Sequence, residues 1–239
     1  MMKKILLLSV AAAVLMAFPA NASLLDDLEE LMNAPVPTQP DGGNVDLGLK
    51  EALHVGIKNT IDALGKKDGY FGNAAIKILL PEKIRKLEPA LRGIGYGPQI
   101  DEFTLSMNRA AEKAAPLAAD IFSSAIREMS FEDANKILRG GNTAATDDLK
   151  AKTYPKLLEK FEPHVRETLG EYKITQKFDA LNAKAQKIPL VGQAVNMDIN
   201  HYVSAKALDG LFWMLAEEET NIRTNPQARV TGLLKEVFK

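Results

Sequence analysis

The sequence predicts an all-α protein: a single bundle of about eight to ten helices around one central apolar helix, with no substantial sheet. Three observations predict this class. Apolar residues recur at helical spacing along most of the chain, and prolines and glycines divide these stretches into pieces of helix length. The stretch 207–216 is apolar nearly all the way round, as expected of a helix buried on most sides.

The first 22 residues have the pattern of a secretory signal peptide. Lys3 and Lys4 precede the apolar stretch 5–18, and Ala20-Asn21-Ala22 forms a small-x-small cleavage site. We therefore expect export across the inner membrane to the periplasm, with cleavage before Ser23. The rest of the chain contains no second long apolar stretch, so no transmembrane segment is expected in the mature protein.

Residues 23–46 form the second predicted region, a short amphipathic helix followed by a linker. Leucines at helical spacing alternate with acidic residues in 23–33, and the stretch 34–44 is rich in proline and glycine. This helix either docks on the body of the protein or offers its leucines to a partner. Residues 47–239 are then expected to form a single helical domain.

Within this domain the helices follow one another along the chain. The spacing predicts helices over 47–64, 81–91, 99–115, 117–129, 131–139, 149–169, 175–187, 199–223 and 226–238. Pro155 and Pro163 are expected to bend or break the helix over 149–169. Ser130 begins a capping box, and Asp198 caps the most apolar helix. The segment 76–80 is either a short strand or an extended segment, and we favour the latter because no second strand is available.

The glycine pair Gly140-Gly141 is the most specific local feature. Both glycines can reach the left-handed conformation that closes a helix, and Asn142 or Thr143 can cap the next helix. The free N–H groups of that second helix, with Arg139 beside them and Arg109 in support, suggest a site for a small anion. The alternative is a tight helix-to-helix turn whose donors are all satisfied within the protein.

Polar residues interrupt apolar helices at three further places. Asn108, Arg109 and Glu112 lie at helical spacing in an alanine-rich stretch, where they either tie helices together or line a pocket. Asp209 lies in the apolar stretch 207–216, as a buried acid or as an ion-paired or solvent-facing residue. Glu218 shares a face with leucines, so at least one glutamate of the run 217–219 is expected to turn inward, with Glu218 as the candidate; the alternative is a run that is simply solvated.

Several classes of chemistry have no sequence support. The chain contains no cysteine, which removes thiol catalysis and thiolate metal sites. His54, His164 and His201 are not spaced as metal ligands, and no nucleophile elbow is present, so we expect no metal, no cofactor and no assigned catalytic residue. The formal net charge of −1 gives no support to nucleic acid as a partner.

The chain resembles a bacterial exported family catalogued as domain of unknown function 4197. The residues that carry the resemblance are Met107-Asn108-Arg109-Ala110-Ala111-Glu112, Phe131-Glu132-Asp133-Ala134, Gly140-Gly141-Asn142-Thr143-Ala144-Ala145-Thr146 and Ala207-Leu208-Asp209-Gly210-Leu211-Phe212. In that family the position of Asn142 usually holds an aspartate. The resemblance implies an exported helical protein and supplies no activity, cofactor or catalytic residue.

Three functions follow as hypotheses. The first is a binding or scaffold protein for an unknown ligand or a periplasmic protein, with the anion site described above. The second is a carrier for an apolar or lipid-like ligand held between helices, near Phe103, Met107, Phe212, Trp213 and Met214. The third is an acid-base enzyme that uses Asp209 with a glutamate from the run 217–219.

Overall fold

The computed structural model describes residues 43–171, 173–185, 197–229, 231–232 and 235. The predicted signal peptide, the helix over 23–33 and most of the predicted helix over 226–238 lie outside these residues. The described elements are α2 (Gly43–Gly65), α3 (Glu82–Arg85), α4 (Glu88–Gly93), α5 (Gly97–Ala114), η1 (Ala115–Leu117), α6 (Ala118–Arg127), α7 (Phe131–Leu138), α8 (Ala144–Glu171), α9 (Ile174–Ala185), α10 (Ile199–Thr224) and η2 (Pro226–Ala228). The all-α prediction is confirmed.

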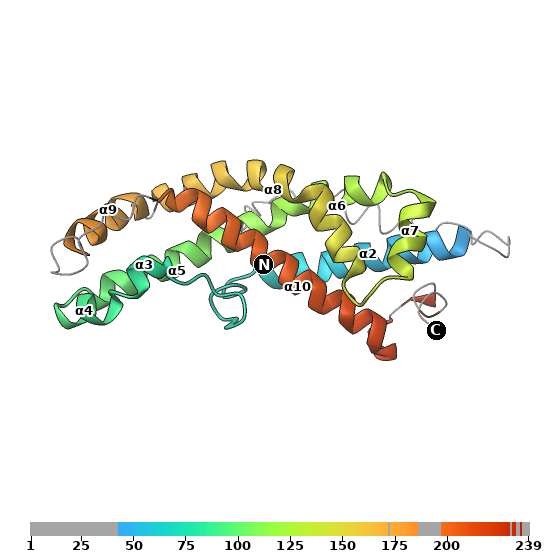
Figure 1. Cartoon of the computed structure of the whole chain (residues 1–239), viewed down its shortest axis with the longest axis horizontal. Helices are drawn as coiled ribbons and strands as arrows, with labels where there is room; N and C mark the ends of the chain where they lie inside the picture. Colours follow the sequence, from blue (N-terminus) through green and yellow to red (C-terminus); the bar gives the residue numbers. More distant parts are fainter. Residues whose placement is uncertain (1–42, 172, 186–196, 230, 233–234, 236–239) are drawn as a thin grey trace, which may run out of the picture.

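Helix α10 is the central element of an elongated bundle, as predicted (Figure 1). It runs diagonally across the middle of the molecule and contacts α8, α2 and α5. Helices α4 and α9 lie at one end of the molecule, and α7 lies near the other. Asp198 caps α10 by accepting hydrogen bonds from the amides of Asn200 and His201. The predicted capping box at Ser130 is also present, at the start of α7.

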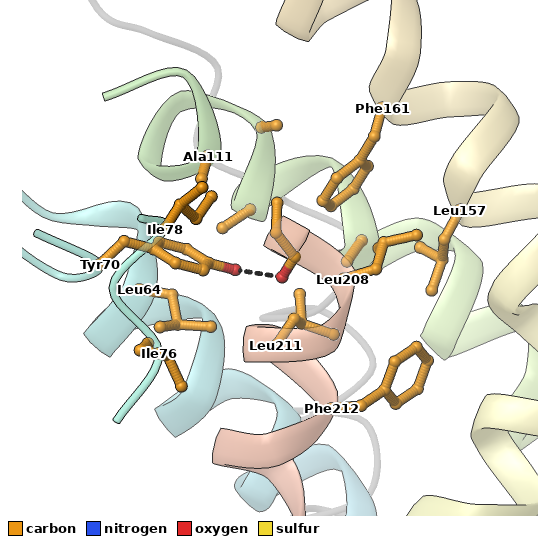
Figure 2. Close-up of a cluster of buried hydrophobic side chains, with 14 of the residues drawn as sticks. Leu64, Tyr70, Ile76, Ile78, Ala111, Leu157, Phe161, Leu208, Leu211 and Phe212 are labelled. Atoms are coloured by element: carbon orange, nitrogen blue, oxygen red, sulfur yellow. Dashed lines mark hydrogen bonds between the residues drawn. The ribbon is translucent and has the colours of Figure 1, made fainter. Parts of the chain in front are cut away.

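The hydrophobic core lies where α2, α5, α8 and α10 meet. Figure 2 shows Leu157 and Phe161 of α8 pointing toward Leu208 and Leu211 of α10. Tyr70 enters the same core from the loop after α2, and its hydroxyl donates a hydrogen bond of 2.8 Å to the carbonyl of Ala207. This bond satisfies the one polar atom that the buried ring brings with it.

Of the two effects expected of Pro155 and Pro163, a bend or a break in α8, the break does not occur. The helix continues from Ala144 to Glu171 with Pro155 and Pro163 inside it. Each proline removes one backbone hydrogen bond, but both lie on the exposed face, while the opposite face packs against α5 and α10. Burial of that face offsets the lost hydrogen bonds.

The predicted helix over 81–91 is divided into α3 and α4, which was not expected. Pro89 lies in the first turn of α4, where its missing N–H costs nothing. A proline in that position suits the start of a new helix better than the end of an old one. The segment 76–80 forms no strand, which confirms the preference for an extended segment over a strand.

Candidate functional site

The loop between α2 and α3 forms one wall of the candidate site, and Asn108 of α5 holds it in place. The Asn108 side chain is fully buried. Its Oδ1 accepts a hydrogen bond of 2.8 Å from the amide of Ile78, and its Nδ2 donates one of 2.9 Å to the carbonyl of the same residue. The side-chain amide thus takes the place of a neighbouring strand, and the loop needs no sheet partner.

Glu112 and Arg109 fix the earlier part of this loop. Glu112 Oε1 accepts hydrogen bonds of 3.2 Å from the amides of Tyr70 and Phe71. Arg109 donates to Glu112 Oε2 at 2.5 Å and to Asp68 at 2.7 Å. Of the two roles considered for Asn108, Arg109 and Glu112, the structure supports the tying of elements together. It also places the ion pairs of Arg109 at this loop and not at the glycine pair.

A surface hollow lies between this loop and α10, and we call it the α10 groove. Its volume is about 320 Å³. Residues from the loop, from α3 and from one face of α10 line it: Ala75, Ile76, Lys77, Ile78, Leu79, Arg85, Tyr202, Lys206, Asp209, Gly210 and Trp213.

Two contacts fix the position of the loop against α10. At one end the Tyr202 hydroxyl donates a hydrogen bond of 3.0 Å to the carbonyl of Leu79. At the other end the loop approaches Gly210 so closely that a Cβ there would lie 2.8 Å from Cε1 of Tyr70 and 3.2 Å from Cβ of Ile76. Only glycine permits this approach, so Gly210 lets the loop pack directly on α10.

The wall of the groove combines exposed apolar side chains with charge. Leu79 is 44% exposed and Trp213 is 43% exposed, so two large apolar side chains line the same hollow. Lys206 forms an ion pair of 3.0 Å with Asp209, and this hydrogen bond raises the pKa of the Lys206 amine. Burial raises the pKa of the Tyr202 hydroxyl, which therefore stays protonated as the donor to Leu79.

Asp209 lies in this groove but not in the buried setting that an enzyme role requires. Its side chain is 48% exposed. None of the three nearby glutamates joins it among the groove-lining residues. The structure thus supports the ion-paired, solvent-facing alternative for Asp209.

One glutamate of the run 217–219 does turn inward, and it is Glu219 and not the candidate Glu218. Glu218 is partly buried and accepts a hydrogen bond of 2.6 Å from Asn59. Glu219 is 8% exposed and points to the start of α8. Its Oε1 accepts the amide of Ala145 at 3.0 Å, and its Oε2 accepts the amide of Thr146 at 2.8 Å. A neighbouring helix therefore supplies the cap that the local sequence assigned to Asn142 or Thr143.

This arrangement occupies the donors on which the predicted anion site depends. Arg223 pairs with Glu219 at 2.8 Å and balances its charge, while Arg139, Gly140, Gly141 and Asn142 lie exposed beside it. An external anion would have to displace a carboxylate that the chain itself provides. The anion site at Arg139–Thr143 stays a prediction, and the groove is the better-supported site.

The glycine pair also differs in conformation from the expectation. Among the described glycines only Gly95 has a left-handed φ, of 91°. Gly140 is required for another reason, since a Cβ there would lie 2.5 Å from Cβ of Ala144. Gly141 has open space around it.

Two other hollows differ from the α10 groove in volume and in lining. The larger one, of about 600 Å³, lies between α6, α7 and α8 and is lined mostly by polar and charged side chains, with Lys152 paired to Asp133 at 3.2 Å and Asp148 at 2.9 Å. The other is an apolar cavity of about 20 Å³ between α2, α8 and α10, which is the size of a water molecule. It has no room for the apolar ligand of the carrier hypothesis.

The residues named for that carrier hypothesis do not share one cavity. Phe103, Met107 and Phe212 are buried in the packed core, and Phe212 contacts Phe122 edge to face at 5.7 Å. Trp213 alone of the five lines the α10 groove. Within the described part of the chain no group of three metal-ligating side chains comes together.

The sequence contains a pattern that indicates the groove, but the apolar helical pattern of α10 makes it hard to recognise. Tyr202, Lys206, Asp209, Gly210 and Trp213 follow one another at intervals of three or four residues, or directly, and so occupy one face of α10. A polar and aromatic stripe on an otherwise apolar helix indicates a face that other helices do not cover. The opposite wall comes from residues 75–79, more than 120 positions earlier, and local spacing does not reveal it.

Comparison with known proteins identifies a family and no activity. A family model described as "Protein of unknown function (DUF4197)" matches residues 40–239. No curated protein and no solved structure matches the chain. None of the helices in the described part of the chain combines the length and hydrophobicity needed to cross a bilayer.

Proposed function

The chain belongs to the DUF4197 family, and we propose that it is an exported binding protein that holds a small ligand in the α10 groove. One observation carries this proposal: Leu79 and Trp213, two large apolar side chains, are left exposed in the same hollow. Burying them under a ligand would remove apolar surface from water, which is the main driving force of association. Export is supported by the leader pattern of residues 1–22.

The volume and the lining of the groove support the binding of a small ligand better than the structure supports the other two hypotheses. Its volume lies at the lower end of the range of about 300 to 1,000 Å³ that is typical of small-molecule sites. Apolar walls with a few fixed polar groups are also typical of such sites. Hydrogen bonds with Asn108 of α5 and Tyr202 of α10 hold the loop wall in place, so the groove exists before a ligand arrives.

The chain offers its own reporter for a binding test, since Trp213 is its only tryptophan. We expect the dye 1-anilinonaphthalene-8-sulfonate to bind the purified protein saturably and to accept energy from Trp213. Replacing Leu79 by Asp removes apolar contact area and adds a charge, which should weaken dye binding about tenfold. Fluorescence titration of the two proteins measures the difference.

The matched control is Ile94→Asp, the same type of change at a side chain that is 60% exposed and outside the groove. This variant should bind the dye as the unchanged protein does. Equal loss in both variants, or no loss with Leu79→Asp, would mean that the groove is not the binding site.

A further inference from the structure

We infer that the ligand of the α10 groove is a monomeric amphiphile with an apolar chain and a single anionic head, of the alkyl carboxylate class. This inference rests on the proposed function and assigns the chemistry of its ligand. It follows from the charges that line the groove, the position of its apolar surface and its volume.

The groove carries an excess of positive charge. Lys77, Arg85 and Lys206 line it against one carboxylate, that of Asp209. Arg85 is exposed and forms no salt bridge with another described residue, although its charge acts on the Glu82 carboxylate. Its guanidinium presents a fork of donors that matches the two oxygens of a carboxylate. The groove therefore favours an anion over a cation or a neutral ligand.

The remaining basic residues limit how much negative charge the groove accepts. Asp209 lies 3.0 Å from Lys206 and partly balances its charge. Lys77 Nζ lies 3.8 Å from the centre of the Phe71 ring, and this cation–π contact restricts the motion of the lysine side chain. A head with two negative charges would meet the Asp209 carboxylate beside Lys206, so a single charge fits best.

The two large apolar side chains lie toward opposite ends of the groove. Leu79 of the loop wall accepts a hydrogen bond from Tyr202, and Trp213 follows Lys206 and Asp209 further along α10. Arg85 lies at the Tyr202 end, where its charge acts on the Tyr202 hydroxyl. A head bound at Arg85 therefore leaves its alkyl chain to extend past Leu79 toward Trp213.

The shape of the site favours a free ligand over a membrane or a protein surface. Leu79 and Trp213 line an open hollow of about 320 Å³. A bilayer or a folded partner needs a continuous apolar surface, whereas a single chain of about ten carbons fits a hollow of this size.

The experiment compares decanoate, decan-1-ol and decylammonium below their critical micelle concentrations, with Trp213 fluorescence as the readout. Decanoate should bind at least about fivefold more tightly than decan-1-ol, and decylammonium most weakly. The preference for decanoate should fall as salt is added, because exposed charges are screened. Vesicles of anionic lipid should change Trp213 fluorescence less than decanoate does.

Three variants assign the charge preference to a residue. Arg85→Gln should weaken decanoate about five- to tenfold and leave decan-1-ol unchanged. Lys83 lies two residues before Arg85 on α3 and outside the groove, so Lys83→Gln should change the affinity for neither decanoate nor decan-1-ol. Arg85→Lys should retain part of the preference, since it keeps the charge but loses the fork.

The outcomes separate this inference from the proposed function. If all three probes bind with equal strength, or if Arg85→Gln has no effect, the groove binds ligands and the inferred class is wrong. Binding to anionic vesicles alone would replace the free amphiphile by a membrane surface. If neither the dye nor any of the three probes changes Trp213 fluorescence, the proposed function fails together with the inference.

Discussion

Glu219 connects two helices through a single buried carboxylate. It accepts the amides of Ala145 and Thr146 and the hydroxyl of Thr146, and it pairs with Arg223. The sequence predicted a helix start after the glycine pair with donors that suit an anion. It did not predict that the anion is a side chain, since the two partners lie 73 and 74 residues apart and only the packing of α10 on α8 brings them together.

Replacing Glu219 by Gln should destabilise the fold by about 2 to 4 kcal/mol. The amide keeps one acceptor, but its NH₂ group faces a backbone donor or Arg223, and the buried Arg223 loses its counter-charge. Urea unfolding followed by circular dichroism measures the loss. Glu217→Gln, on the exposed face of the same helix, should change stability by less than about 0.5 kcal/mol. A similar small effect for Glu219→Gln would show that the contact contributes little.

At the scale of elements, the glycine pair shows which features local patterns predict. The end of α7 and the start of α8 were both predicted from glycine and cap residues within a few positions. The reason for Gly140 was not, because the close approach of Ala144 depends on the path of the turn. The continuity of α8 has the same explanation. Its prolines locally favour a bend or a break, and packing against α10 and α5 keeps the helix unbroken.

The two glycines should respond differently to the same substitution. Gly140→Ala places a Cβ 2.5 Å from Cβ of Ala144, a contact that the backbone must shift to relieve, and should cost about 1 to 3 kcal/mol. Gly141→Ala meets open space at a φ that is not left-handed, so it should be neutral or stabilise by up to about 1 kcal/mol. Thermal unfolding of both variants tests this difference. Equal effects of the two substitutions would contradict the account of the turn.

At the scale of the whole molecule, the bundle and the groove differ in how far the sequence predicts them. Helical spacing is local, so the all-α fold and the central position of α10 followed from it. The groove is assembled from the loop after α2, from α3 and from α10, and its walls are distant in sequence. The sequence indicated Asp209 as a candidate functional residue. Its position at the surface depends on the loop opposite it, which helical spacing does not predict.

The central claim is that ligands bind the α10 groove and not the helix start beside the glycine pair. The most direct test is a titration of the ¹⁵N-labelled protein with decanoate, followed by amide chemical shifts. Saturable shifts should concentrate in residues 75–79 and 202–213, and residues 139–146 should stay unchanged. Shifts concentrated in residues 139–146, with the groove residues unaffected, would contradict the claim.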